Sequence, residues 1–170
     1  MKTLIYFMHP EAEKSVRGRQ ILDTLKFKTN ITIRELSTIY KKRPSFTPEE
    51  IKAEQEIILQ HDRMIFMYPM FWYNMPAYGR TFLDNLFTVG FAYIEGAETN
   101  AKLEGKKFKC IATLGATSEF FVAESLGTPE MIQCQMKALC LFTGMKYEGS
   151  DFYFAEDGDE KVAKICAAFD

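Results

Sequence analysis

Three consecutive large aromatic residues, flanked by prolines, form the segment of this chain best suited to binding a flat ligand. Phe71, Trp72 and Tyr73 lie between Pro69 and Pro76. Aromatic faces and edges pack on a planar ring, and the main-chain groups of such a loop pair with ring N–H and carbonyl groups. The segment is therefore a candidate wall for the isoalloxazine ring of a flavin. A place in the core or in a subunit interface is the alternative interpretation.

A second group of candidate residues follows the first apolar run. His9 comes just after that run, and Ser15, Val16 and Arg17 open the next amphipathic segment. Free backbone N–H groups at a helix N-terminus suit a phosphate, as do a hydroxyl and a guanidinium. We expect these four residues to bind the phosphate region of a flavin. The alternative is that Ser15 is only an N-cap and His9 only a loop residue.

The third candidate loop, Thr113, Leu114, Gly115 and Ala116, follows another apolar run. Gly115 lets the backbone approach a ligand closely, and Thr113 offers a hydroxyl. Backbone N–H groups here would stabilise negative charge on the pyrimidine edge of a reduced flavin. We expect the loop to bind that edge, with an ordinary strand-to-helix turn as the alternative.

Alternating apolar runs and 3.6-periodic segments predict the elements that hold these loops. Strands are expected at residues 3–8, 31–36, 63–68, 106–113 and 146–154. Helices are expected at residues 15–27 (with Ser15 as N-cap), 47–60, from 76, 129–142 and 157–170, and loops at 37–48 and 95–104. This alternation is typical of a parallel sheet covered on both faces. We therefore predict a flavodoxin-like doubly wound α/β fold, five parallel strands in the order 2-1-3-4-5.

In that fold the loops after the first, third and fourth strands meet at the carboxyl edge of the sheet. Their joint presence favours a flavin site more than any one loop does alone. At 170 residues the chain is long enough for one sizeable core, so a single domain over residues 1–170 is expected.

Charge and cysteine content argue against several other classes of protein. The net charge of −2 gives no electrostatic case for nucleic acid. No run approaches the roughly 20 apolar residues of a membrane span. The cysteines match no metal-ligand or Cys-x-x-Cys spacing, and their apolar neighbours predict buried thiols at Cys110, Cys134, Cys140 and Cys166. A reduced, cytoplasmic setting without a metal site is expected.

Several motifs together give the chain a broader resemblance. They are His9-Pro10 with Ser15, Glu54-Gln55, the run from Tyr68 to Ala77, Gly90-Phe91-Ala92-Tyr93, and Thr113-Leu114-Gly115-Ala116. At these residues the chain resembles the NAD(P)H:quinone oxidoreductase family. That family includes DT-diaphorase, the bacterial drug-activity-modulator quinone reductases and the ancillary proteins of glutathione-regulated potassium efflux.

The resemblance implies a homodimeric flavoenzyme that moves a hydride from NADH or NADPH to flavin N5 and then to a quinone or similar flat acceptor. FMN is the expected flavin and FAD the alternative. The cofactor residues it implies are His9, Ser15, Val16, Arg17, Pro69, Met70, Phe71, Trp72, Tyr73, Thr113, Leu114, Gly115 and Ala116. On the substrate side it implies Trp72, Phe121 and Tyr93, the last reaching the partner's flavin.

The chain departs from the diaphorase pattern where a side chain would relay a proton. Phe121 falls at the place of a tyrosine, and Gly127 falls near that of a histidine. We therefore name no catalytic side chain. A regulatory ancillary protein of a potassium-efflux transporter and a flavin-dependent azo or nitro reductase are the alternative functions.

Overall fold

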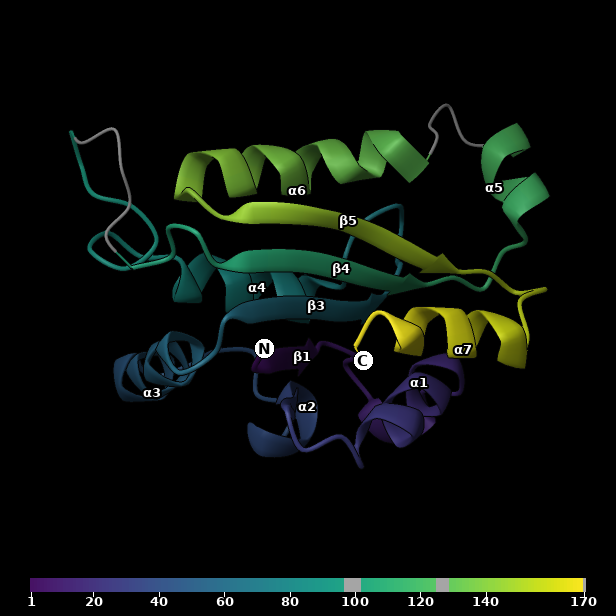
Figure 1. The fold of residues 1–170 in the computed structure, drawn as a ribbon, viewed down its shortest axis with the longest axis horizontal. Helices are drawn as coiled ribbons and strands as arrows, with labels where there is room; N and C mark the ends of the chain where they lie inside the picture. Colours follow the sequence, from purple (N-terminus) through teal and green to yellow (C-terminus); the bar gives the residue numbers. More distant parts are fainter. Residues whose placement is uncertain (97–101, 125–128, 170) are drawn as a thin grey trace.

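The computed structural model describes residues 1–96, 102–124 and 129–169 (Figure 1). The strands in these ranges are β1 (Thr3–Phe7), β2 (Ile31–Glu35), β3 (Arg63–Pro69), β4 (Lys107–Thr113) and β5 (Lys146–Tyr153). A short 3-10 helix, η1 (Ala12–Lys14), precedes the first α-helix. The α-helices are α1 (Arg17–Leu25), α2 (Leu36–Ile39), α3 (Pro48–Leu59), α4 (Ala77–Leu86), α5 (Ser118–Glu124), α6 (Pro129–Thr143) and α7 (Asp159–Ala167).

The five strands form one parallel sheet in the order β2-β1-β3-β4-β5, which confirms the predicted fold and strand order. β1 pairs with both β2 and β3, so Thr3 lies beside Ile31 on one side and Arg63 on the other. The strand order reverses between β1 and β3, and ligands of such sheets bind at the carboxyl ends beside this point. The arrowheads of β4 and β5 lie at the same end of the sheet as α5 (Figure 1).

Alternate residues of the strands supply two apolar cores, one on each face of the sheet. On one face Ile5, Phe7 and Ile65 pack with residues of α1 and α7. On the other face Tyr6 and Phe66 pack with residues of α3, α4 and α6. The sheet is therefore covered on both sides, as the continuous apolar strands predict.

A buried ionic network joins β1, β2 and α3. Glu54 is fully buried on α3, where its carboxylate accepts hydrogen bonds from Tyr6 (3.1 Å), Arg34 (2.5 Å) and Tyr40. Burial, with Glu54 as neighbour, raises the pKa of Tyr6 far above its ordinary value. The Glu54-Gln55 motif thus has a structural role, because a buried carboxylate needs these partners.

The structure corrects four expectations about local structure. Ser15 does not cap α1: Val16 is the N-cap residue, and no side chain accepts from the first turn. The predicted 37–48 loop contains most of α2, and α5 was not predicted, because both helices are too short for a clear apolar period. Cys134 is exposed, since it lies two positions before the buried Met136 and so on another side of α6.

Other local expectations hold or fall outside the described ranges. The helix predicted at residues 47–60 is α3, which Thr47 caps and where Thr47 and Glu50 form a capping box. Cys110, Cys140 and Cys166 are buried, and burial raises the pKa of Cys110 to about 12. Half of the predicted 95–104 excursion, residues 97–101, and Gly127 lie outside the described residues. Within those residues, no helix has the length and apolar composition needed to cross a lipid bilayer.

Candidate active site

Two of the three predicted loops line an open cavity of about 210 Å³ at the carboxyl ends of β3 and β4. Hydrogen bonds beyond the strand ends hold them, with the Met70 N–H donating to Thr113 O (2.8 Å) and the Leu114 N–H to Tyr153 O (2.8 Å). The residues that line the cavity are Met70, Trp72, Tyr73, Leu114, Gly115, Ala116, Phe120 and Phe121. None of them carries a charge, so this cavity suits a flat and largely apolar ligand.

The aromatic segment forms a two-residue hairpin turn. The N–H groups of Phe71 and Asn74 donate to each other's carbonyl oxygens at 2.9 and 3.1 Å. Between them, Trp72 and Tyr73 have φ values of 52° and 64°. Positive φ at both central residues is the mark of a type I′ turn, which normally takes Asn and Gly. Two bulky aromatic residues in this conformation are strained.

The same turn exposes its aromatic rings and two unused donors. Trp72 is 94% exposed, and Phe71 and Tyr73 are also exposed at the surface. Among the described residues, the Trp72 and Tyr73 N–H groups have no hydrogen-bond partner. Exposed aromatic groups and free donors beside a cavity suit the binding of a flat ring, so the ring-binding wall stays a prediction that this geometry allows.

Phe121 packs against the aromatic turn through the ring of Tyr73. Its side chain is buried, with ring centroids 5.6 Å from Tyr73 and 6.0 Å from Phe154. The neighbouring Phe120 is exposed and also lines the cavity. The structure thus places Phe121 at the cavity, on a helix that was not predicted, and its role toward a substrate stays a prediction.

The first loop lies beside the aromatic turn but does not line the cavity. The His9 ring lies 6.4 Å from that of Phe71. His9 Nδ1 accepts a hydrogen bond from the Glu11 N–H (3.0 Å), and burial lowers the pKa of His9. The imidazole is therefore neutral at pH 7 with its proton on Nε2.

The N-terminus of α1 has an open anion-binding geometry. No side chain caps the helix, its first turn contains no acid, and the N–H groups of Arg17, Gly18 and Arg19 donate to no described residue. By contrast, α3 is capped by Thr47 and has two acids in its first turn. Free N–H groups and the macrodipole favour a negative ligand at α1.

Close packing on β1 fixes the position of that helix end. A methyl group on Gly18 would lie 2.6 Å from Ser15 Oγ and 2.7 Å from the Phe7 ring. Such distances are far below van der Waals contact, so only glycine allows α1 to approach β1 this closely.

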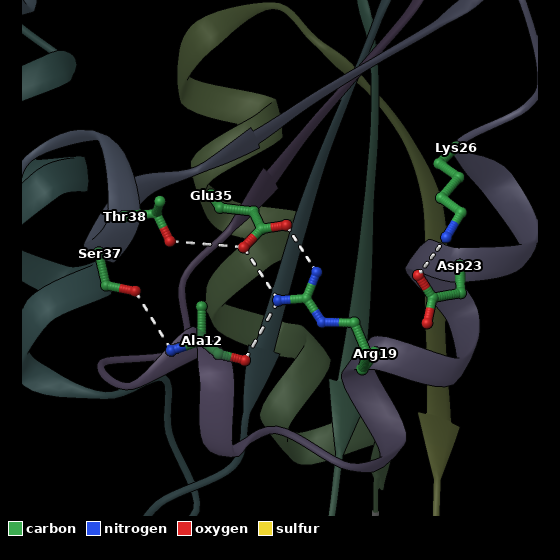
Figure 2. Close-up of polar contacts among 7 residues, drawn as sticks. All are labelled: Ala12, Arg19, Asp23, Lys26, Glu35, Ser37 and Thr38. Carbon is green, nitrogen blue, oxygen red and sulfur yellow. Dashed lines mark hydrogen bonds and ion pairs between the residues drawn. The ribbon is translucent and has the colours of Figure 1, made fainter.

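Figure 2 shows a polar clamp that braces the first loop from β2 and α2, and which the sequence did not reveal. Arg19 donates to both oxygens of Glu35, at 2.7 and 2.9 Å, and to Ala12 O at 3.2 Å. The Ala12 N–H donates to Ser37 Oγ (3.3 Å). The Arg19 guanidinium lowers the pKa of Glu35, so the pair is ionised at neutral pH. Arg19 and Glu35 lie 16 positions apart in the sequence, a separation that no local motif signals.

The loop after β5 contacts the first and third loops and was also missed. The Ala155 N–H donates to Ala116 O (2.9 Å), and Arg17 donates to Ala155 O (3.3 Å). Glu156 accepts from the N–H and hydroxyl of Ser118. This segment therefore connects α1, the third loop and α5.

Tyr93 and the basic run after α2, two further candidates for ligand contacts, do not line the cavity. Tyr93 contacts Phe142 of α6, with ring centroids 5.3 Å apart, and lines a separate hollow with Leu83 and Phe87. The substrate role of Tyr93 at a partner's flavin therefore stays a prediction. In the basic run after α2, Lys42 pairs with Glu13 and Arg43 with a carboxylate of α3.

Comparison with known proteins agrees with this architecture. The chain matches the Flavodoxin_2 family, described as a flavodoxin-like fold, over residues 1–169. It is 35% identical over 123 residues to the uncharacterized NAD(P)H oxidoreductase YrkL of Bacillus subtilis (strain 168), covering 72% of this chain and 67% of that protein. It is 31% identical to general stress protein 14 of the same organism, covering 97% and 95%.

Other relatives and solved structures extend the comparison. The chain is 31% identical to the glutathione-regulated potassium-efflux system ancillary protein KefG of Enterobacter sp. (strain 638), covering 74% of this chain and 64% of that protein. An NADPH-quinone reductase from P. pentosaceus has the same fold, with TM-score 0.83, 23% identity and 99% and 95% coverage. So has general stress protein 14 from Treponema denticola in complex with FMN, with TM-score 0.82, 22% identity and the same coverage.

By its fold this chain is a flavodoxin-like protein, and two of its relatives are named NAD(P)H oxidoreductases. It belongs to the flavodoxin-like family that the sequence predicted, the one that includes NAD(P)H oxidoreductases and the potassium-efflux ancillary proteins.

Proposed function

We propose that the protein is an FMN-dependent NAD(P)H:quinone oxidoreductase. The observation that carries this proposal is the uncharged cavity between the strained aromatic turn and the loop after β4. The relatives named NAD(P)H oxidoreductases support the reaction class, and the FMN complex of a similar structure supports the cofactor. When bound, the flavin supplies hydride transfer between a nicotinamide nucleotide and the acceptor.

The residues present fit a flavin at this place. The aromatic turn and Leu114 to Ala116 would hold the isoalloxazine, with free N–H groups of Trp72 and Tyr73 as donors. A methyl group on Gly115 would contact no atom within 4 Å, so the backbone there is open to a ring. The uncapped N-terminus of α1, with Ser15 and Arg17, would hold the phosphate.

The protein's part in this reaction is positioning and electrostatics. No lining residue carries a carboxylate, an imidazole or an ammonium group, and Phe121 lacks the hydroxyl of a relay tyrosine. Ring faces align a flat acceptor, and backbone N–H groups stabilise charge on the reduced ring. Neutral His9, beside Phe71, has an Nε2–H that can donate to a polar edge of the bound ligand.

A homodimer is part of this proposal. Helix α6 exposes Met131, Leu141 and Phe142 at spacings that share one side of the helix, and Ile94 is exposed near its end. An apolar stripe of this kind is typical of an interface. Sedimentation equilibrium should give twice the chain mass of 19.6 kDa, and a single-chain mass at micromolar concentration would contradict it.

The spectrum of the purified protein tests the function directly. We expect flavin absorbance that bleaches with NADH or NADPH and returns on addition of a quinone. If no flavin binds after reconstitution and neither NADH nor NADPH is oxidised, the proposed enzymatic function is refuted.

The phosphate assignment makes a separate prediction. Replacing Ser15 and Arg17 by alanine should weaken flavin binding by about 10- to 100-fold, because hydrogen bonds to charged groups contribute about 1.5–3 kcal/mol. Unfolding free energy should fall by less than about 1 kcal/mol, since both side chains are partly exposed. The control is Arg80→Ala, which removes an exposed pair with Asp84 on α4. Unchanged flavin affinity in the double variant would show that Ser15 and Arg17 do not bind the phosphate.

The potassium-efflux relatives favour a second candidate function, regulation of a membrane transporter. In that case the protein would dock on a transporter at the cytoplasmic side of the membrane. A cytoplasmic location agrees with four free cysteines. Co-purification with a potassium transporter encoded beside this gene would support regulation, and its failure would leave the enzyme as the sole candidate.

A further inference from the structure

Helix α5 forms one wall of the cavity but is attached to the fold by few groups. Phe121 packs against Tyr73 and Phe154. Within its own first turn, the Phe120 N–H donates to Thr117 Oγ1 (3.2 Å). The Phe121 N–H also donates to Thr117 O (2.9 Å), and a further polar attachment comes from the loop after β5.

That attachment is the carboxylate of Glu156. Its Oε1 accepts the Ser118 N–H at 2.8 Å and the Ser118 hydroxyl at 2.5 Å. These hydrogen bonds lower the pKa of Glu156, with a smaller contribution from Arg17, so the carboxylate is ionised at neutral pH. A carboxylate that accepts N–H groups at the start of a helix stabilises that helix end.

The segment that carries Glu156 is itself held in place. Ala155 is hydrogen-bonded to Ala116 of the third loop and to Arg17 of α1, and the Phe154 N–H donates to Asp157 Oδ2 (2.7 Å). The position of α5 is therefore set relative to the loops that line the cavity.

We propose that Glu156 is a positioning residue that holds α5 across the cavity, so that Phe120 and Phe121 form the wall against which a flat quinone acceptor packs. This role rests on the proposed function, because it assigns the α5 side of the cavity to the acceptor. Glu156 is not itself a lining residue of the cavity and acts through Ser118.

Two measurements on the flavin-loaded protein test this role without turnover. Hydrogen exchange of the amides of residues 118–121 should be about tenfold faster in Glu156→Ala, because an unlatched helix end opens more often. The dissociation constant for 2-methyl-1,4-naphthoquinone should rise about five- to tenfold, because the aromatic wall is displaced. Fluorescence of Trp72, the single tryptophan of the chain and a lining residue, reports that binding. Flavin content should not change.

Glu156→Gln keeps an acceptor oxygen but loses the charge, so we expect an exchange rate and a dissociation constant between those of the wild type and Glu156→Ala. This conservative variant also serves if Glu156→Ala does not fold. Glu160→Ala, an acid in the first turn of α7, is the matched control and should change neither quantity. Wild-type exchange rates in Glu156→Ala would show that Glu156 does not hold α5 in place. Faster exchange with unchanged naphthoquinone binding, or no binding to the wild type, would overturn the acceptor role. Failure to oxidise nicotinamide nucleotides would refute only the proposed reaction, since neither measurement needs turnover.

Discussion

Replacing Trp72 by Asn and Tyr73 by Gly should make the flavin-free protein more stable and at the same time weaken its affinity for flavin. Both residues have positive φ, which costs a bulky side chain about 1–2 kcal/mol each, whereas Asn-Gly prefers this turn. Little burial is lost, because Trp72 is almost fully exposed. We expect a net gain of about 1–2 kcal/mol in the unfolding free energy of the apoprotein, measured in urea, because the lost contact of Tyr73 with Phe121 offsets part of the relieved strain. Flavin affinity should fall at least about tenfold, because the aromatic faces are gone.

The chain contains a matched control for this experiment. Lys41 and Lys42 also have positive φ, at 51° and 57°, but they lie in the loop after α2. Lys41→Asn with Lys42→Gly should give a similar gain in stability without a change in flavin affinity. A loss of stability in the turn variant would show that the aromatic turn is not strained. A gain in stability without weaker flavin binding would show that the turn is strained but does not bind the flavin.

Removal of the Glu54 carboxylate should have the largest effect on stability. Glu54→Ala leaves Arg34 next to the core without its partner, and two tyrosine hydroxyls lose their acceptor. Breaking a buried ion pair in this way costs about 3–5 kcal/mol. Thermal unfolding should shift down by about 10 °C for a chain of this size.

Two variants test the origin of that effect. Glu56→Ala removes an exposed acid from the same helix and should change the unfolding free energy by less than about 0.5 kcal/mol. Replacing both partners, Arg34→Met with Glu54→Leu, should recover most of the lost stability, because no unpaired charge remains. If the double variant is no more stable than Glu54→Ala, then packing rather than charge explains the loss.

The elements that could be predicted are those with a strong local signal. The continuous apolar runs around Ile5, Ile65 and Ile111 gave the strands, and their alternation with helices gave the sheet order. The start of α3 was predicted because Thr47, Pro48 and two acids are adjacent in the sequence. The convergence of two loops on a cavity followed from the fold itself.

What could not be predicted depends on contacts between distant residues or on conformations that the residue types disfavour. Nothing in Trp72-Tyr73 indicates a type I′ turn, because neither residue prefers positive φ. The Arg19–Glu35 clamp and the contact of Glu156 with Ser118 join separate loops. Ser15 looked like an N-cap, but the chain enters α1 through η1 and presents Val16 instead.

The missing side chain at Gly18 has a consequence for the thermodynamics of ligand binding. Because α1 rests directly on the Phe7 ring, the first turn of the helix and the end of β1 cannot shift independently. The N–H groups of that turn are therefore preorganised before any ligand arrives. An anion bound there would pay little conformational entropy, so its affinity should depend mainly on charge and desolvation.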